Sequence, residues 1–505
     1  MGIKLPDILR ISAGKYPDKI ALIVEGEKTT FRQLHERANQ RANALLKIGV
    51  KKGEHVATLV KNSRELIECI FGILKTGAVL TPLNYRLSKD ELIYIINHMD
   101  VKTLIFSSSF VNEINDIAIQ TPNVSKFLPI IGSCPKGFID FEKETEQAQA
   151  WYKELDIEEN DPATLLCTAG TTGKPKGVLA THQAWMWSCL NCILAMKIKQ
   201  ETVSLMVYPL FHVAAFLNLF SLIFSGSTLV IMQDFDPKLV LKLIDKEKIN
   251  RLGNPPSVYN MILQVPDIDK YNLDSVRLLN SASEIMPADT MKQIQQVFPN
   301  AGIFDNYGMT ETCSLLTSRS EEYTEAKPNS VGLPVISMEV HVEDEEGREL
   351  PPGEIGEIVA RGPSLMVGYY KDQEMTKQSI KDGWLHTQDL GYMDQDGFLY
   401  IVERKQHMII SGGENIYPKE VEDVLCCHPK ILETAVFGVP DKIWGQNVCA
   451  AVVLKQAATM SEEEVIDYCR SNIASFKKPK KVIFLSKLPR NEVRKVLRTE
   501  LKKMI

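Results

Sequence analysis

The sequence predicts an α/β protein built from two or more domains. At 505 residues the chain is too long to form one compact core. Through about residue 330, segments with helical patterning alternate with short apolar runs, which is typical of parallel sheets covered by helices. The pattern changes after residue 332 and again after residue 406, so further structural units are expected there.

The first α/β elements carry clear boundary signals. The segment 30–49 indicates a helix, because Thr30 and Gln33 match a capping box and Gly49 is a typical helix stop. A strand-like run at 55–60 follows, then the helical pattern RELIECIFGILKTGA and the strand-like VLTPLN. This alternation predicts parallel strands, and a second series of the same kind runs to about residue 330.

Two smaller regions follow. Between Gly332 and Tyr400, short alternating strands separated by turn residues predict a β-rich subdomain, with the acidic run 343–346 as a solvated hairpin tip. Beyond Gln406 the pattern predicts a small α+β unit of normal domain size. Its expected elements are a helix at 419–425, strands at 433–439 and 448–454, a helix capped by Ser461 and Glu464, and a strand at 481–485.

The bulk composition is that of a soluble enzyme, with 44% apolar and 24% charged residues. A net charge of −6 argues against a dedicated nucleic-acid binder, which usually has a basic face. The chain lacks a signal-peptide pattern and any apolar stretch long enough to span a membrane, so we expect a cytoplasmic protein. The ten scattered cysteines suggest buried thiols rather than disulfides or zinc ligands.

The segment from Thr168 to Lys176, TAGTTGKPK, is typical of a loop that holds a polyphosphate. Its glycines let the backbone approach an anion, its threonine hydroxyls can donate to phosphate oxygens, and its lysines offset phosphate charge. A flexible surface turn is the simpler alternative, but this concentration of glycine, threonine and lysine favours phosphate binding. A P-loop NTPase does not fit, because Gly170 and Gly173 are three residues apart.

Six further motifs follow this loop in the order found in the adenylate-forming superfamily. They are PLFH at 209–212, SASE at 281–284, NYGMTE at 306–311, WLHTQDLG at 384–391, ERKQHMIISGGENIYPKEVE at 403–422 and PRNEVRKVLR at 489–498. The sequence therefore resembles that superfamily over nearly its whole length. Its members include acyl-CoA synthetases, aryl-CoA ligases, firefly luciferase and peptide-synthetase adenylation domains.

The resemblance implies a large N-terminal AMP-binding domain, 1–405, with two stacked α/β subdomains and a small β-rich one. A small mobile α+β domain, 406–505, would follow. It also implies an AMP-forming acyl-CoA synthetase that uses ATP, Mg²⁺ and CoA. Such an enzyme adenylates a carboxylic acid, because AMP is a better leaving group than a free carboxylate oxygen, and then transfers the acyl group to CoA. Positioning and electrostatic stabilisation would carry most of the catalysis.

The resemblance further implies how ATP and Mg²⁺ are held. The β- and γ-phosphates would contact Thr168, Gly170, Thr171, Thr172, Gly173, Lys174 and Lys176, and the α-phosphate would contact Thr310. Glu311 would bind the metal ion, with Thr168 nearby, and the adenine would lie against Ser283, Glu284, Asn306 and Tyr307. Asp389 would bind the ribose, and Arg404 would reach the ribose or the phosphates. A carboxylate suits Mg²⁺, and an aromatic face can stack on a base. Alone, Glu311 or Asp389 would be ordinary surface carboxylates, so the assignment depends on the motif residues around them.

Lys495 stands where the superfamily has the lysine that bridges the substrate carboxylate and the α-phosphate. In that family the small domain then rotates about a hinge, here Gln406, to present a CoA tunnel. Ser411, Gly412 and Gly413 would line this tunnel by close backbone approach. His212 corresponds to a gate between the acid and the nucleotide, although a single histidine is more often structural.

Four residues depart from the superfamily pattern. Ala169 replaces a hydroxyl residue in the phosphate loop, Gln388 replaces glycine, Gln406 replaces the usual hinge residue, and Arg494 replaces the glycine before the catalytic lysine. If that glycine has a positive φ, Arg494 is strained there and adenylation is slower than in close relatives. Reverting Arg494→Gly tests this through the rate of ATP–pyrophosphate exchange.

The predicted acid pocket is apolar and rich in aromatic residues. Its expected lining is Phe211, Val213, Phe216, Leu217, Phe220, Met309 and Cys313, with Trp185 or Trp187 nearby. Such a lining, without a buried charge, favours a fatty or aryl acid over an amino acid. The same spacing fits plain core packing equally well.

Three alternatives remain. The chain could load a carrier protein instead of CoA, could bind acyl-adenylates with weak catalysis, or, as a distant third, could be an oxygen-dependent luciferase. The expected partners are a small carboxylic acid, ATP and CoA, without nucleic acid or a membrane span, and a homodimer is the candidate oligomer.

Overall fold

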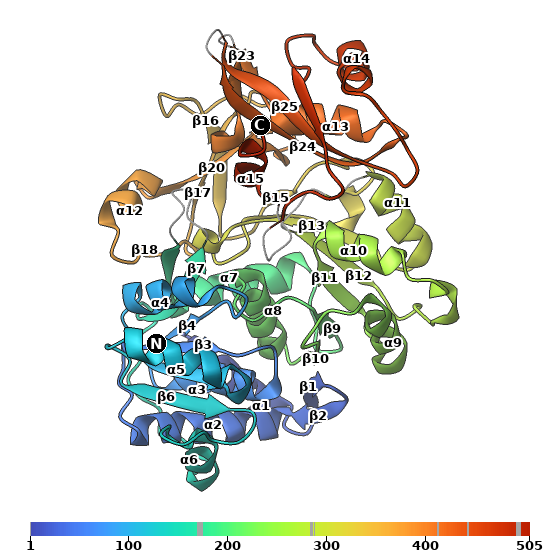
Figure 1. The fold of residues 1–505 in the computed structure, drawn as a ribbon. Coiled ribbons are helices and arrows are strands. Elements are labelled where there is room, and N and C mark those ends of the chain that lie inside the picture. Colours follow the sequence, from blue (N-terminus) through green and yellow to red (C-terminus); the bar gives the residue numbers. More distant parts are fainter. Residues whose placement is uncertain are drawn as a thin grey trace. The chain divides into compact units, whose positions relative to one another are not determined.

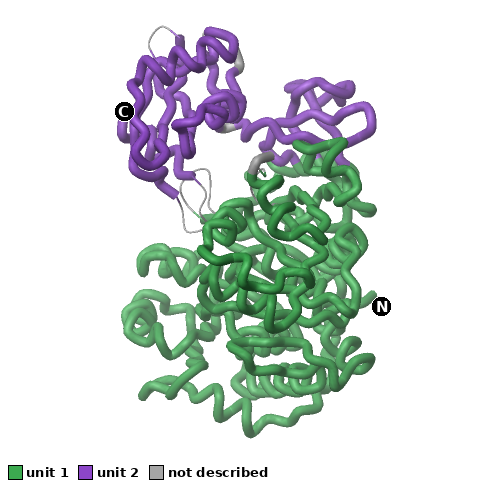
Figure 2. Tube along the Cα trace, turned by 90° about the vertical axis from the view of Figure 1, so that its right-hand side faces the viewer, with its two compact units in different colours: residues 1–339, 360–385 green, residues 340–359, 386–505 purple. Residues whose placement is uncertain are grey.

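The computed structural model describes residues 2–168, 175–282, 286, 288–411, 414–441, 444–490 and 496–505. The chain divides into two compact units, of which the first contains residues 1–339 and 360–385 and the second residues 340–359 and 386–505 (Figure 2). The chain therefore passes from one unit to the other three times. The predicted division into a domain of residues 1–405 and a mobile domain of residues 406–505 stays a prediction.

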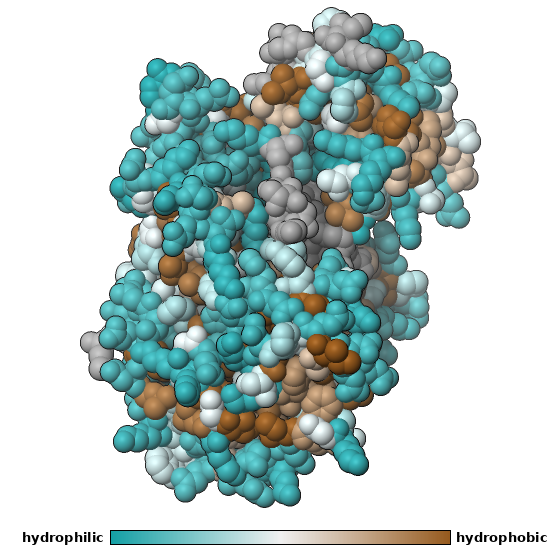
Figure 3. Space-filling view, turned by 60° about the vertical axis from the view of Figure 1, so that its left-hand side comes forward, coloured by the Kyte–Doolittle hydropathy of each residue, from teal (hydrophilic) through white to brown (hydrophobic). Residues whose placement is uncertain are grey.

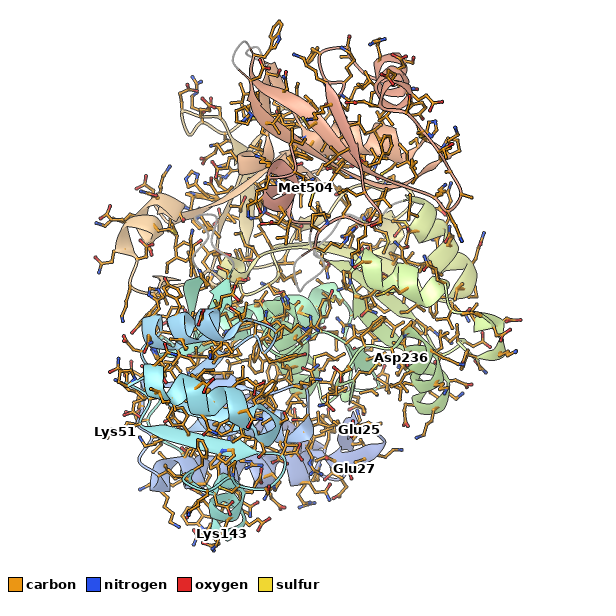
Figure 4. All side chains as sticks on the ribbon, viewed as in Figure 1. Glu25, Glu27, Lys51, Lys143, Asp236 and Met504 are labelled. Carbon is orange, nitrogen blue, oxygen red and sulfur yellow. The ribbon has the colours of Figure 1, made fainter. Side chains whose placement is uncertain are left out.

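Unit 1 contains a nine-stranded sheet with a parallel centre (Figure 1). In sheet order its strands are β15 (Leu333–Pro334), β14 (Thr317–Arg319), β13 (Gly302–Tyr307), β12 (Leu278–Ala282), β11 (Arg251–Asn254), β9 (Val203–Met206), β10 (Thr228–Ile231), β1 (Ile20–Val24) and β2 (Glu27–Thr30). Strands β1, β10, β9, β11, β12 and β13 run parallel, whereas β2, β14 and β15 pair antiparallel with their neighbours. Glu25 and Gly26 turn β1 into β2 with positive φ angles of 51° and 87°; Glu25 and Glu27 are labelled in Figure 4.

A second sheet of unit 1 has seven strands. Its order is β18 (Gly368–Tyr369), β8 (Lys176–Thr181), β7 (Pro162–Thr168), β4 (Val79–Pro82), β3 (His55–Leu59), β5 (Val101–Ser107) and β6 (Lys126–Ile130). Strands β7, β4, β3, β5 and β6 are parallel, while β8 pairs antiparallel with both β7 and β18. The α/β fold class predicted from the alternating pattern is confirmed.

Helices surround these two sheets. They are α1 (Leu5–Lys15), α2 (Phe31–Lys47), α3 (Arg64–Lys75), α4 (Lys89–His98), α5 (Val111–Gln120), α6 (Phe141–Gln147), α7 (His182–Ala195), α8 (Val213–Phe224), α9 (Pro237–Glu247), α10 (Pro256–Leu263), α11 (Ala288–Val297) and α12 (Gln373–Ser379). The capping box predicted for α2 is present, since Thr30 accepts from the backbone N–H of Gln33 and the Gln33 side chain bonds back to Thr30. Asp236, labelled in Figure 4, caps α9 by accepting hydrogen bonds from two backbone N–H groups.

The β-rich region predicted between residues 332 and 400 is a five-stranded sheet. Its path is β16 (Glu339–Glu343), β17 (Gly356–Arg361), β20 (Trp384–Met393) and β19 (Ile380–Lys381), and β21 (Leu399–Arg404) also pairs with β20. The acidic segment after β16 is an exposed turn in which Arg348 pairs with Asp344 at 2.7 Å, as expected for a solvated tip. The chain crosses between the units within β16, β17 and β20.

The C-terminal elements form a sheet with an apolar core of its own. The strands follow the order β23 (Glu414–Ile416), β22 (Ile409–Ser411), β25 (Gly445–Leu454) and β24 (Ile431–Asp441), with β26 (Lys481–Phe484) on β25, and the helices are α13 (Pro418–Cys426), α14 (Glu462–Asn472) and α15 (Arg498–Lys502). Ser461 and Glu464 form the predicted capping box of α14. The α+β character predicted for this region is thus present.

The molecular surface is mainly polar on the face shown in Figure 3. Among the described residues, no helix combines the length and the apolar character that a bilayer crossing requires.

The first residue of α7, His182, gives unit 1 a pH-dependent stability. Its side chain is 0% exposed, and burial lowers the pKa of the imidazole to about 4. The unfolded chain takes up a proton below pH 6.5 whereas the folded chain does not, so stability present above pH 6.5 is lost as the pH falls towards 4. We expect the free energy of unfolding to fall by about 2 kcal/mol between pH 7 and pH 5 through this group. Urea unfolding of wild type and His182→Leu at both pH values checks this, because the leucine variant should show a shallower pH dependence.

Candidate active site

The β7–β8 hairpin holds the two ends of the predicted phosphate loop. Thr168 and Lys176 are direct cross-strand partners, and the register continues inward through Cys167 and Gly177. The intervening candidates Gly170, Thr171, Thr172, Gly173 and Lys174 lie outside the described residues. The hairpin therefore fixes where the loop begins and ends.

Glu311 lies in a 3₁₀ turn, Thr310–Thr312, that follows β13. Its side chain is 7% exposed, and its Oε1 accepts a 2.8 Å hydrogen bond from the Tyr369 hydroxyl. Within the described part of the chain, no arginine or lysine forms an ion pair with this carboxylate. A buried carboxylate with a single neutral donor is well suited to binding a hard cation.

Tyr369 connects the predicted metal ligand to the phosphate-loop hairpin. It lies on β18 opposite Val178 of β8, and the Lys176 ammonium lies 5.4 Å from the centre of its ring. The Tyr369 hydroxyl meanwhile binds Glu311. Sequence reasoning missed Tyr369, because it lies outside the seven motifs and reaches Glu311 only through the pairing of β18 with β8.

The backbone after Glu311 is held in an unusual conformation. Cys313 and Ser314 have positive φ angles of 49° and 87°, which non-glycine residues rarely adopt. The Ser188 hydroxyl of α7 donates to the Cys313 carbonyl at 2.7 Å, and a Cβ on Gly308 would come within 2.0 Å of the Ser314 oxygen. This tight turn sets the position of Thr310 and Glu311, in keeping with the concentration of backbone strain at functional sites.

The predicted adenine-binding residues lie at the carboxyl end of β13. Asn306 and Tyr307 are 7% and 8% exposed, and Asn306 is in register with Ala282 at the end of β12. The Asn306 amide donates to the Oδ1 of Asn280. Ser283 and Glu284 lie outside the described residues. Carboxyl ends of parallel strands are the usual ligand-binding edge of α/β sheets.

Asp305, next to Asn306, is a second buried acid. Burial raises its pKa to about 7, although the Arg319 guanidinium 3.8 Å away favours the ionised form. Asp305 and Arg319 are cross-strand partners in β13 and β14. This pair therefore joins the strand that carries Asn306 to its antiparallel neighbour β14.

His212 is half-buried and directly precedes α8. Burial, assisted by the nearby Arg86 charge, lowers its pKa to about 4, so the imidazole is neutral near pH 7. Its ring centre lies 5.4 Å from that of Phe211, and the Arg86 guanidinium lies 6.0 Å from the Phe211 ring. Sequence reasoning missed Arg86, which comes from a segment far from PLFH.

Several predicted acid-pocket residues form a continuous aromatic core. Trp185, Phe216 and Phe220 are 0% exposed, and their ring centres lie 5.4 to 6.2 Å apart. The Trp185 indole donates to the Thr164 hydroxyl at 2.8 Å, whereas Trp187 is 40% exposed. For these three buried rings, the contacts agree with the core-packing alternative.

Unit 2 brings Asp389 and Arg404 together. They are cross-strand partners in β20 and β21, and Arg404 Nε lies 2.8 Å from Asp389 Oδ1. Asp389 is 3% exposed, and its backbone N–H donates to Thr387 Oγ1 at 3.1 Å. The two residues are separated in the sequence, and the strand pairing brings them into contact.

The remaining predicted residues of unit 2 are placed less fully. Ser411 ends β22 and pairs with Gly445 of β25. Gly412, Gly413 and Lys495 lie outside the described residues. On either side of the Lys495 segment, Arg490 and Val496 form an antiparallel bridge.

Comparison with known proteins agrees with these features. The AMP-binding enzyme family model matches residues 9–370, and the model of the AMP-binding enzyme C-terminal domain matches residues 420–495. The chain is 34% identical to the 2-succinylbenzoate–CoA ligase of Bacillus mycoides (strain KBAB4) over 502 residues, covering 99% of both chains.

Solved structures of related enzymes have the same fold. The anthranilate CoA ligase AuaEII in complex with anthranoyl-AMP superposes with a TM-score of 0.92 at 28% identity, covering 99% of this chain and 97% of that one. The o-succinylbenzoate CoA synthetase (MenE) from Bacillus subtilis in complex with its acyl-adenylate intermediate OSB-AMP gives a TM-score of 0.86 at 32% identity and covers 99% of each chain. The chain belongs to the AMP-binding enzyme family, within the adenylate-forming superfamily that its motifs predicted.

Proposed function

We propose that this chain is an AMP-forming acid–CoA ligase. It adenylates a carboxylic acid with ATP, releases pyrophosphate, and transfers the acyl group to CoA with release of AMP. The observation that supports this most strongly is end-to-end similarity to 2-succinylbenzoate–CoA ligases, which covers both the large and the C-terminal regions.

In the first half-reaction the chain holds ATP at several points. The hairpin ends Thr168 and Lys176 present the phosphate loop, Thr310 contacts the α-phosphate, and Asn306 and Tyr307 line the adenine. Glu311 and Thr168 would hold Mg²⁺, which when bound neutralises phosphate charge; a related MenE structure contains ATP and a magnesium ion. The buried Glu311 carboxylate fits this role because its described donor is the neutral Tyr369 hydroxyl.

Residues of unit 2 complete the reaction in this proposal. Asp389 accepts the ribose hydroxyls while Arg404, paired with it, reaches the ribose or phosphates. Lys495 bridges the acid and the α-phosphate, and rotation of residues 406–505 about Gln406 then withdraws it. Ser411, Gly412 and Gly413 line the path of CoA, and neutral His212 separates the acid from the nucleotide.

The acid that we propose is aromatic. Two relatives act on aromatic acids by name, 2-succinylbenzoate and anthranilate, and both align over at least 97% of their length. Phe211 lies beside His212, and its ring centre is 5.3 Å from that of Tyr85; these aromatic side chains suit a flat ring. We further propose a homodimer in the cytoplasm, which light scattering and cell fractionation can test.

A panel of acids tests the proposal. We expect CoA-dependent AMP release with 2-succinylbenzoate or anthranilate, at a kcat/KM on the order of tenfold or more above that with saturated fatty acids, because the ring stacks on aromatic side chains. Release of AMP only with a carrier protein would favour the carrier-loading alternative. Absence of ATP–pyrophosphate exchange with every acid would contradict the proposal and favour an acyl-adenylate-binding protein.

A further inference from the structure

Glu357 on β17 is a nearly buried carboxylate, 9% exposed, with an unusual set of donors. Its Oε1 accepts from both the backbone N–H of Gln388, at 3.2 Å, and the side-chain amide of Gln388, at 2.9 Å. Its Oε2 lies 3.1 Å from the Lys405 ammonium and 3.7 Å from His386 Nδ1. Both carboxylate oxygens are therefore used: Oε1 contacts β20, and Oε2 lies near both β20 and the residue that follows β21.

The residues that Glu357 holds are the immediate chain neighbours of Asp389 and Arg404, and they lie on the same side of that pair because β20 and β21 are antiparallel. Gln388 directly precedes Asp389, and Lys405 directly follows Arg404. Asp389 and Arg404 are themselves opposite each other in β20 and β21. One carboxylate from a third strand thus contacts both chain segments immediately beside this cross-strand pair.

Gln388 needs this support because of its backbone conformation. Its φ angle is 62°, in the left-handed region that glycine adopts without strain but glutamine does not. The next N–H, that of Asp389, bonds to Thr387 Oγ1, so the carboxylate of Asp389 is aimed by this local turn. Two hydrogen bonds from Gln388 to Glu357 stabilise the turn, and the Lys405 ammonium, 3.1 Å from the other carboxylate oxygen, holds the Glu357 side chain in place.

We propose that Glu357 is a positioning residue for nucleotide recognition, which fixes Asp389 and Arg404 so that they read the ribose hydroxyls. This proposal rests on the proposed function, because it assumes that Asp389 contacts the ribose. It adds a residue outside the WLHTQDLG and ERKQ motifs, and it explains how this chain accommodates glutamine where relatives of its superfamily carry glycine.

Binding of AMP and of 2′-deoxy-AMP, measured by calorimetry without any acid or CoA, tests the proposal. Wild type should prefer AMP by roughly tenfold or more, because one hydrogen bond to a carboxylate is lost with the deoxy compound. In Glu357→Ala the Kd for AMP should rise on the order of tenfold while that for 2′-deoxy-AMP changes little, so the preference disappears. Glu357→Gln retains an oxygen acceptor for Gln388 and should lie between the two.

Two further variants separate positioning from a general structural effect. Glu339→Gln removes a carboxylate from an exposed ion pair with Arg361 and should leave the preference unchanged. Gln388→Gly in the Glu357→Ala background should restore at least part of the preference, because glycine adopts the positive φ angle without support.

Three results would overturn the proposal. They are an unchanged AMP preference in a folded Glu357→Ala protein, an equal loss of affinity for both nucleotides, and no rescue by Gln388→Gly. If instead wild type binds AMP with the expected preference but adenylates no acid, the proposed function fails while the role of Glu357 stands.

Discussion

Replacing Lys495 with alanine is expected to lower ATP-dependent adenylation by about 10³-fold, while thioester formation from a pre-formed acyl-adenylate stays near the wild-type rate. A lysine ammonium that bridges the carboxylate and the α-phosphate neutralises charge that grows as the new bond forms, and losing one such preorganised group has an effect on the order of 10²–10³ in kcat. The second half-reaction begins after that charge has left with pyrophosphate, so it does not need the same group.

Separate assays of the two half-reactions measure this difference. ATP–pyrophosphate exchange reports adenylation, and release of AMP from synthetic acyl-AMP plus CoA reports thioester formation. Lys503→Ala is a matched control, because Lys503 is an exposed lysine near the C-terminus that pairs only locally with Glu500. Equal losses in both assays, or no loss in either, would contradict the assignment of Lys495.

The described residues that border the Lys495 segment make several contacts within the C-terminal region. Arg490 and Val496 form a bridge, and the backbone N–H of Leu497 donates to the Pro489 carbonyl at 2.8 Å. Just beyond it, the Arg498 guanidinium bonds to Glu422 at 2.7 Å and to the Val436 carbonyl at 3.0 Å. The residues that border the segment are therefore bonded to each other, and Arg498 is bonded to α13 and β24.

A Glu311→Gln substitution is expected to reduce adenylation by on the order of 10²–10³-fold and to raise the Mg²⁺ concentration needed for half-maximal rate. The amide is nearly isosteric but carries no charge, so it still accepts from Tyr369 yet binds a divalent cation weakly. The affinity for AMP without metal should change little, because the adenine and ribose contacts lie elsewhere. Initial rates over a Mg²⁺ titration, with AMP binding measured in parallel, check both expectations.

Tyr369→Phe is the matched comparison for Glu311→Gln. It removes the hydroxyl that donates to Glu311 but retains the ring beneath Lys176, so we expect a loss of about tenfold, within the usual range for residues that orient a metal ligand. A larger loss in Tyr369→Phe than in Glu311→Gln would contradict the ordering of roles. A Mg²⁺ requirement unchanged by Glu311→Gln would remove Glu311 from the metal site.

Local signals in the sequence predicted the fold well. The capping boxes at Thr30 and Ser461 and the alternation of elements depend on residues close together in the chain, and the structure confirms them. Helix α12 was missed, because its seven polar-rich residues show no apolar periodicity. Its start depends instead on Asp372, which caps the backbone of Met375.

The candidate site residues were predicted from their resemblance to family motifs. The motifs did not predict which residues from other parts of the chain contact them. Tyr369 lies 58 residues from Glu311, and Glu357 reaches Gln388 from 31 residues away. Such contacts arise only when strands pair, and a single sequence contains no periodic signal for them. The positive φ angle of Gln388 could not be predicted either, because a glutamine residue does not indicate a left-handed backbone conformation.

The three crossings of the chain between its two compact units restrict how the enzyme can be divided. No single cleavage or truncation releases either unit intact, because residues 360–385 of unit 1 interrupt the sequence of unit 2. A fragment that begins at residue 340 would contain residues 360–385 without the rest of unit 1, against which they pack. Split-enzyme reporters and domain-exchange chimaeras should therefore take their junctions after β21, where the chain does not return to unit 1.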